Sequence, residues 1–334
     1  MPVPKLWDFG QGAQVGTAGY RCFRWNDSGR LRPVWTDVWY PARAPEQAVF
    51  YGAGQGSAAM DAAIDTSAAP HRLIVMSHGA FGLARDYSWI AEHLARRGFV
   101  VLGVSHYGES WVYGPETIEQ AAVTRLWLRP PDCTFAIECL LSDHEFKESV
   151  DPARVGALGH SSGGATAMAL GGATFDAAAL MAYCRSGEAA NDLGCRYAET
   201  ISAAQTPPPQ AAASYRDPRV VAIAVLDPAA GPGFNATSLA AVRVPVLVVG
   251  SEENDFLPYA QHAAHFAALL PRCSLITLRR GEGHFVYLNC ADSGLQANGV
   301  PLYVDRLGVD RQAVHARLAP AITDFFETTL GGKR

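Results

Sequence analysis

Residues 155–172 read VGALGHSSGGATAMALGG, and this stretch limits the possible folds of the chain more than any other. The apolar run VGAL predicts a buried strand, and the run of small residues after the glycines predicts a helix. The pattern Gly-x-Ser-x-Gly fits only residues 159–163, because centring it on Ser162 would require a glycine in place of His160. A strand that turns at once into a helix leaves no space for side chains two residues before and after the serine. The stretch therefore predicts a sharp turn with Ser161 at its tip, against the alternative of an ordinary glycine-rich turn.

Apolar segments and helical segments alternate along most of the chain. Besides an outer strand at residues 34–40, we expect strands at residues 72–76, 99–104, 155–158, 220–226, 245–250 and 274–278, and helices at residues 86–97, 115–128, 131–141, 259–270 and 314–330. This alternation is typical of a mostly parallel sheet with helices on both faces, in which ligands bind at the carboxyl ends of the strands. The sequence therefore predicts a single α/β domain over residues 1–334.

Two segments interrupt the alternation. Residues 52–70 consist mainly of alanine, glycine and serine, and they predict a surface loop. Residues 184–217 contain CRSGEAANDLGC and TPPPQ and separate one predicted helix from the next strand. We expect this second segment to form a small cap or lid over the edge of the sheet, with a surface loop of no function as the alternative.

Composition and charge exclude several classes of protein. The 334 residues are 49% hydrophobic and 18% charged, the net charge is −5 and no basic run exceeds two residues, which argues against a nucleic-acid surface. No apolar run approaches the roughly 18 residues of a membrane span. The first ten residues, MPVPKLWDFG, lack the basic and apolar regions of a secretory signal, so we expect a cytoplasmic protein, with a periplasmic or secreted one as the alternative. The oligomeric state is left open.

The seven cysteines are scattered and form no CxxC pair, which argues against a structural zinc site. We expect no metal and no organic cofactor. Cys184 and Cys195 could close a short loop if the protein is exported.

A serine hydroxyl at such a turn needs a base before it can act as a nucleophile. In proteins with this turn the partners follow in the order serine, carboxylate, histidine. His284 lies in the loop GEGHFVYLN directly after a predicted strand, and Gly281 and Gly283 allow that loop to fold back over the sheet. The other downstream histidines lie in or near predicted helices, where surface or packing roles are expected: His262, His265 and His315. His284 is therefore the predicted base.

The carboxylate is expected in the loop after the preceding strand, VPVLVVGSEENDFLP. This loop offers Glu252, Glu253 and Asp255. Asp255 is favoured, because it lies a few residues beyond the strand and its short side chain fixes the geometry of an imidazole well. Glu253 is the alternative.

A developing oxyanion needs two N–H donors. We expect one from the backbone of Ser162, the residue after the nucleophile, and the other from Ala80 in MSHGAFG, residues 76–82. Phe81 would then line the acyl pocket. His78 is expected to support this loop and not to act as a second base.

Five blocks, taken in order, resemble the dienelactone-hydrolase-like branch of the α/β-hydrolases, which includes platelet-activating-factor acetylhydrolase-like esterases: SHGAFG, DYSWIAEHLARRGFVVLGVSHYG, DPARVGALGHSSGG, VPVLVVGSEENDFLP and GEGHFVYL. The early VWYPAR also resembles the first strand of that branch, so the resemblance covers most of the chain. It implies the α/β-hydrolase fold, a triad of Ser161, Asp255 and His284, and oxyanion donors at Ala80 and Ser162.

The sequence departs from this pattern in places. True dienelactone hydrolases use a cysteine nucleophile, so the serine argues against their reaction. Residues 105–108 read SHYG, where relatives often carry a motif similar to DHPG. Many relatives are exported and hold cap cysteines in disulfides, and the resemblance would place such cysteines at Cys184, Cys195 and Cys290.

The resulting hypothesis is hydrolysis of a small-molecule carboxylic ester, with a short or medium acyl group, through an acyl-serine. Trp111, in the loop YGESWVYG, and Phe285 are expected to line the substrate pocket together with Phe81, although ordinary aromatic packing is an alternative for the loop. An amidase, a thioesterase or an acyltransferase would use the same residues. A non-catalytic binding protein that keeps the fold is the alternative from a different class.

Overall fold

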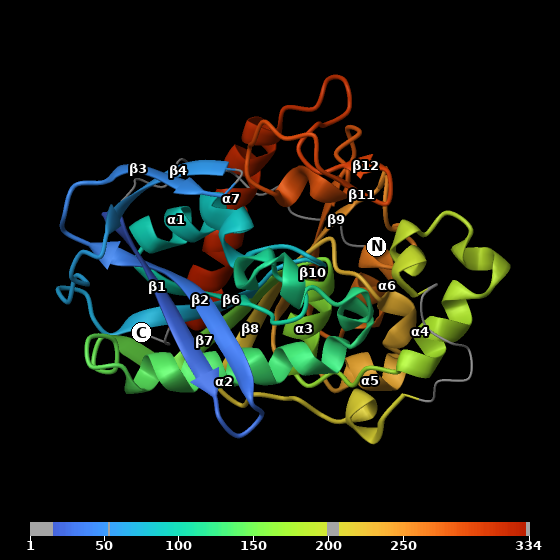
Figure 1. The fold of residues 1–334 in the computed structure, drawn as a ribbon, viewed down its shortest axis with the longest axis horizontal. Helices are drawn as coiled ribbons and strands as arrows, with labels where there is room; N and C mark the ends of the chain where they lie inside the picture. Colours follow the sequence, from blue (N-terminus) through green and yellow to red (C-terminus); the bar gives the residue numbers. More distant parts are fainter. Residues whose placement is uncertain (1–15, 53, 199–206, 332–334) are drawn as a thin grey trace.

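The computed structural model describes residues 16–331, except residue 53 and residues 199–206, and its centre is a ten-stranded sheet with the order β10-β9-β8-β7-β5-β6-β2-β1-β4-β3 (Figure 1). The strands are β1 Thr17–Asp27, β2 Arg32–Ala42, β3 Gln47–Tyr51, β4 Gly54–Met60, β5 His71–Ser77, β6 Phe99–Ser105, β7 Val150–His160, β8 Val220–Leu226, β9 Val246–Ser251 and β10 Cys273–Leu278. The helices are α1 Ser88–Arg96, α2 Arg129–Ser142, α3 Ser162–Leu170, α4 Ala177–Cys184, α5 Ala236–Ala240, α6 Ala263–Leu269 and α7 Arg311–Leu330. A separate short pair, β11 Gln296–Ala297 and β12 Val300–Pro301, is antiparallel.

The strands from β6 to β10 along the sheet run parallel, and β2 joins them antiparallel to β6. Helices cover both faces of this sheet, as alternate residues of one strand show. Leu73 and Val75 of β5 pack in a core with residues of α2, α3, α5 and α6, whereas Ile74 and Met76 pack in a second core with α1 and α7. The predicted mostly parallel α/β sheet is confirmed, and its order and layers are those of the α/β-hydrolase fold (Figure 1).

Three local predictions were wrong. Residues 34–40 lie in β2, which is paired on both sides and is no outer strand. Residues 54–60, expected in a loop, form β4, because their small side chains allow a buried carboxylate to approach the backbone: a Cβ at Gly56 would lie 2.0 Å from Glu92 Oε1. Residues 115–128 form three short 3₁₀ turns instead of a helix: η3 Pro115–Thr117, η4 Gln120–Thr124 and η5 Leu126–Leu128.

The described part of residues 184–217 forms short 3₁₀ turns beside α4, including η7 Leu193–Ala198, and residues 199–206 lie outside the description. Cys184 and Cys195 form a disulfide, whereas Cys290 is a free thiol. A buried contact between His262 Nε2 and Asp192 Oδ2, 2.7 Å, joins this segment to the start of α6. In the described ranges we find no helix with the length and apolar character needed to cross a bilayer. The prediction of a cytoplasmic protein was based on residues 1–10, and these residues lie outside the described part of the chain.

Replacement of Phe326 by alanine tests the packing of α7 on the sheet. The Phe326 ring is fully buried, and we expect Phe326→Ala to lower the free energy of unfolding by about 3–5 kcal/mol, since a large buried ring leaves a cavity. Phe50 is 75% exposed, so Phe50→Ala should cost less than about 1 kcal/mol. Urea unfolding of the two variants measures the difference, and equal losses would contradict this packing.

Candidate active site

Ser161 lies in a strained turn between the last residue of β7 and the first residue of α3. Its φ of 55° and ψ of −120° are unusual for a residue with a side chain. A Cβ at Gly159 would lie 2.0 Å from the Gly163 carbonyl oxygen, and a Cβ at Gly163 would lie 1.9 Å from the Ser77 carbonyl oxygen. Both positions therefore require glycine, and the structure contains the predicted strand–turn–helix with Ser161 at its tip.

His284 contacts this serine from the loop after β10. The loop continues as η10 His284–Tyr287, and the distance from His284 Nε2 to Ser161 Oγ is 3.0 Å. Both side chains are buried, and the Phe256 ring stacks on the imidazole with 5.1 Å between centroids and an interplanar angle of 13°. The ring plane of His284 is thus held in place while its Nε2 points at the hydroxyl.

The carboxylate at the other imidazole nitrogen belongs to Asp227, so the expectation that Asp255 would occupy this place was wrong. Asp227 Oδ2 forms a short contact with His284 Nδ1 and accepts a hydrogen bond from the Asn254 amide. Asp227 Oδ1 accepts the backbone N–H of Ser251, with 3.1 Å between the atoms. These donors compensate for the burial of the carboxylate, whose residue is 1% exposed.

Asp255 supports the same loop in a different way. Its Oδ1 accepts the backbone N–H of His284 at 2.8 Å, and its carboxylate lies so close to Gly283 that a Cβ there would be 2.4 Å from Oδ2. The two aspartates differ in their origin, because Asp227 directly follows β8 and Asp255 follows β9. Both aspartates satisfy the chain order serine, carboxylate, histidine. The sequence analysis overlooked Asp227, although it directly follows the apolar strand VVAIAVL.

His160 joins the serine turn to the histidine loop. Its Nε2 donates to the carbonyl of His284 at 2.9 Å, and its Nδ1 accepts from the Tyr87 hydroxyl at 2.9 Å. That hydroxyl in turn accepts the backbone N–H of Gly79 at 3.0 Å. Burial, and then the neighbouring His284, hold the pKa of His160 well below its usual range, so the ring is neutral and can make both contacts. His160 is therefore part of the scaffold and not a second base.

The expected oxyanion donors lie on either side of the serine. Ser162 is the first residue of α3, a position whose backbone N–H has no acceptor within the helix. Ala80 lies in the loop after β5, where Phe81 has a positive φ of 55°. Ala80, Ser161 and Ser162 all line the smaller of the two cavities described next.

Two cavities meet at Ser161. The smaller has a volume of about 250 Å³ and a largely apolar wall that includes Ser162, Leu180 and Met181, and the disulfide of residues 184 and 195 lies beside it. The larger has a volume of about 620 Å³ and is lined by His284 and by several aromatic rings. Phe81, Trp111 and Phe285, the residues expected at the substrate pocket, all line this larger cavity.

The fold is that of the α/β-hydrolases, and the comparisons with known proteins agree. The Dienelactone hydrolase family matches residues 60–225, so the chain is dienelactone hydrolase-like over that range. A ferulic acid esterase from Streptomyces cinnamoneus is similar in structure, with a TM-score of 0.60 and 17% sequence identity over 96% of this chain and 92% of that chain. At this identity the likeness concerns the fold. No curated protein sequence matches the chain.

Matched substitutions of the two aspartates test which one serves the imidazole. We expect Asp227→Asn to lower kcat for a p-nitrophenyl ester by about 10⁴-fold, because an amide at this place favours the wrong imidazole tautomer. Asp255→Asn keeps an oxygen that can accept the His284 N–H, so its loss should stay within about tenfold. Steady-state kinetics measure both, and a larger loss for the Asp255 variant would contradict the assignment of Asp227.

Proposed function

We propose that the protein hydrolyses carboxylic esters through an acyl-serine intermediate, with Ser161 as nucleophile, His284 as base and Asp227 as its carboxylate partner. One observation carries the proposal: His284 Nε2 lies 3.0 Å from Ser161 Oγ, while its Nδ1 contacts the Asp227 carboxylate. The Asp227 carboxylate can only accept a hydrogen bond, so His284 Nδ1 carries the proton and donates it to this bond. Nε2 is left with the lone pair that can take the serine proton.

The reaction follows from this arrangement. Ser161 Oγ attacks the ester carbonyl as its proton passes to His284 Nε2, and the negative charge of Asp227 stabilises the imidazolium. The backbone N–H groups of Ala80 and Ser162 donate to the oxyanion. The imidazolium then protonates the alcohol oxygen as its bond to the carbonyl carbon breaks. Water repeats the sequence on the acyl-serine and releases the acid.

The two cavities support a division of the substrate. The leaving oxygen must receive its proton from His284 Nε2, and His284 lines the larger, aromatic cavity. The acyl chain then occupies the smaller cavity, which is lined by Ser162 but not by His284 among its described residues. Phe81, which was expected at the acyl pocket, lines the larger cavity, so in this division it contacts the alcohol part of the substrate instead. A cavity of 150 Å³ holds benzene, so a volume of about 250 Å³ suits an acyl group of about six to ten carbons.

The described part of residues 184–217 supports a role as a cap, because it supplies part of the wall of the smaller cavity, including Asp192, Gly194 and Ala198. An amidase, a thioesterase or an acyltransferase would use the same residues with another leaving group or acceptor. The ester is favoured here by the likeness to the esterase fold and by the apolar wall around the serine.

Assays with p-nitrophenyl acetate and butyrate test the proposal. We expect Ser161→Ala to lower kcat by more than about 10⁴-fold, because the attacking oxygen is lost. Ser162→Ala keeps its backbone N–H, so it should lose at most about tenfold. Wild-type protein should release a burst of one nitrophenol per chain when deacylation is slow. Equal rates for wild type and Ser161→Ala would end the enzyme hypothesis.

Chain-length profiles test the division between cavities. Leu180→Trp fills the smaller cavity, so kcat/KM for p-nitrophenyl octanoate should fall about tenfold or more relative to acetate. Trp111→Ala opens the larger cavity and should leave the ratio of octanoate to acetate within about threefold. A changed ratio in the Trp111 variant, with none in the Leu180 variant, would place the acyl chain in the other cavity.

A further inference from the structure

The carbonyl oxygen of Gly79, in the loop after β5, is held by several donors. It accepts hydrogen bonds from His78 Nδ1 at 2.6 Å, from Arg129 Nη2 at 3.2 Å and from the backbone N–H of Gly82 at 3.3 Å. This carbonyl and the N–H of Ala80 belong to one peptide unit, which is planar and trans. Because the two groups of a trans peptide point in opposite directions, fixing the carbonyl fixes the direction of the Ala80 N–H.

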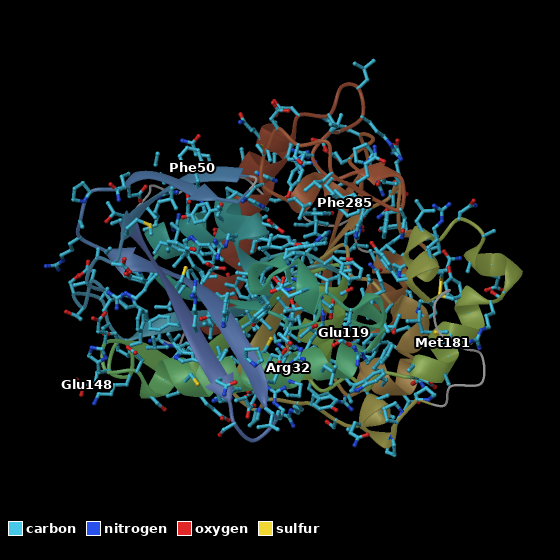
Figure 2. All side chains as sticks on the ribbon, in the orientation of Figure 1. Arg32, Phe50, Glu119, Glu148, Met181 and Phe285 are labelled. Carbon is cyan, nitrogen blue, oxygen red and sulfur yellow. A yellow bond between two sulfur atoms is a disulfide. The ribbon has the colours of Figure 1, made fainter. Side chains whose placement is uncertain are left out.

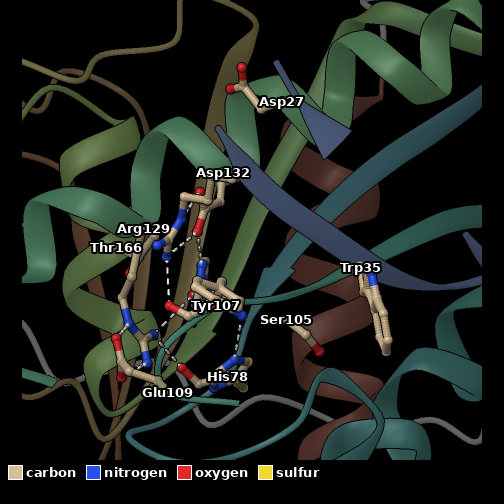
Figure 3. Close-up of polar contacts among 12 residues, drawn as sticks. Asp27, Trp35, His78, Ser105, Tyr107, Glu109, Arg129, Asp132 and Thr166 are labelled. Atoms are coloured by element: carbon tan, nitrogen blue, oxygen red, sulfur yellow. Dashed lines mark hydrogen bonds and ion pairs between the residues drawn. The ribbon is translucent and has the colours of Figure 1, made fainter. Parts of the chain in front are cut away.

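Arg129 is an unusual residue for the interior of the protein, since its side chain is fully buried at the start of α2. Its guanidinium forms a bidentate ion pair with Glu109, with N–O distances of 2.9 and 2.7 Å. Its remaining donors point at the oxyanion loop: Nη1 donates to the His78 carbonyl at 2.7 Å, besides the bond from Nη2 to Gly79. Figure 3 shows the guanidinium between Glu109 and His78.

The tautomer of His78 supports the same orientation. The backbone N–H of His106 donates to His78 Nε2 at 3.0 Å, so Nε2 carries the lone pair and Nδ1 carries the proton. Burial, then the charge of Arg129 and then His106, hold the pKa of His78 well below its usual range, which keeps the ring neutral. Its Nδ1–H therefore donates permanently to the Gly79 carbonyl.

We propose that Arg129, held by Glu109, is a positioning residue that locks the Gly79–Ala80 peptide with its N–H directed at the oxyanion. A flipped peptide would turn its N–H toward a buried cation and place a carbonyl oxygen where the oxyanion develops, so the charge of Arg129 disfavours it strongly. The inference depends on the proposed ester hydrolysis, because it assigns a role within that reaction.

The polar cluster beyond Arg129 joins it to the rest of the fold. Arg129 Nη1 lies 3.4 Å from Ser77 Oγ, which donates to His106 Nε2 at 2.8 Å, and His106 Nδ1 donates to Asp132 Oδ2 at 3.0 Å. Asp132 also accepts from the guanidinium of Arg32. Arg32, labelled in Figure 2, lies on β2, and Asp132 lies on α2, so the cluster connects the oxyanion loop to a strand and to a helix (Figures 2 and 3).

The test compares the variant Arg129→Lys with the control variant Arg96→Lys. Arg96 is the last residue of α1 and lies away from the site. Lysine keeps the charge, but its three N–H donors on a single atom cannot replace the planar fork that bonds both Glu109 oxygens and two backbone carbonyls. Arg96 is a matched control, because it also pairs with a carboxylate, Glu46, and donates to a carbonyl, that of Ser57. We expect kcat to fall about 10- to 100-fold in Arg129→Lys with KM within threefold, since a misdirected oxyanion donor is needed mainly in the transition state.

Infrared spectra of the acyl-enzyme supply the readout that a merely structural role would not change. With a ¹³C-labelled acyl carbonyl, we expect the stretching band of Arg129→Lys to move to higher frequency, because the hydrogen bonds to the carbonyl oxygen weaken. Arg96→Lys should keep the wild-type band. A trifluoromethyl ketone, which forms a tetrahedral adduct with the serine, should bind Arg129→Lys more weakly by the same factor as kcat.

An unchanged band and an unchanged kcat in folded Arg129→Lys would overturn the inference. If that variant does not fold, Glu109→Gln takes its place, because this isosteric change keeps Arg129 and loosens its anchor. It should give a smaller shift of the band in the same direction, and a wild-type band would again overturn the inference. Failure of the wild-type protein to form any acyl-enzyme would instead overturn the proposed function.

Discussion

The close approach of two backbones at the end of the sheet determines the geometry of this protein. Gly163, at the start of α3, lies so close to the Ser77 carbonyl that a single added carbon would be 1.9 Å from it. This contact holds the first turn of α3 against the end of β5, so the serine turn and the oxyanion loop are fixed relative to each other. The strain at Ser161, with its φ of 55°, is maintained because the packed strands on both sides leave the turn no other conformation.

The remaining groups reach the serine because parallel strands end at the same edge of the sheet. Ala80 follows β5, Ser161 follows β7, Asp227 follows β8 and His284 follows β10. The carboxyl-terminal parts of β5, β7 and β8 are buried, whereas β10 lies at the edge of the sheet and is partly exposed. The polar residues that follow these parallel strands therefore emerge at one edge of the sheet.

Buried charged side chains near the site hold neutral imidazole rings and backbone carbonyls in fixed orientations. Two buried carboxylates near the site, Asp227 and Glu109, each have a defined partner: the imidazole of His284 and the guanidinium of Arg129. The neutral rings of His78 and His160 then transmit orientation to backbone carbonyls, at Gly79 and His284 respectively. Burial is the main reason that the pKa of both rings lies well below the usual range, with further contributions from Arg129 beside His78 and from His284 beside His160.

The sequence predicted the elements that have a strong local pattern, and it failed where the decision depends on contacts between distant segments. The turn at Ser161 and the loop of His284 follow from glycine spacing and from a preceding strand, so they were predictable. Asp255 was chosen among the residues that follow β9, and Asp227 was not considered. Both aspartates follow a strand, and only the packing of the loops shows which one meets the imidazole. The 3₁₀ turns of residues 115–128 and strand β4 were missed because proline and small residues carry little periodic signal. Arg129 gives no signal in the sequence, since its role depends on a carbonyl 50 residues away.

Peptide mapping after reaction with a p-nitrophenyl alkylphosphonate tests the central assignment most directly. The reagent resembles the tetrahedral intermediate and stays bonded to the oxygen that attacks it. The geometry around His284 predicts one phosphonyl group per chain, located on Ser161 and not on the adjacent Ser162 when the fragment is sequenced by tandem mass spectrometry. A group on Ser162, or full ester hydrolysis after treatment with no group on either serine, would contradict the account.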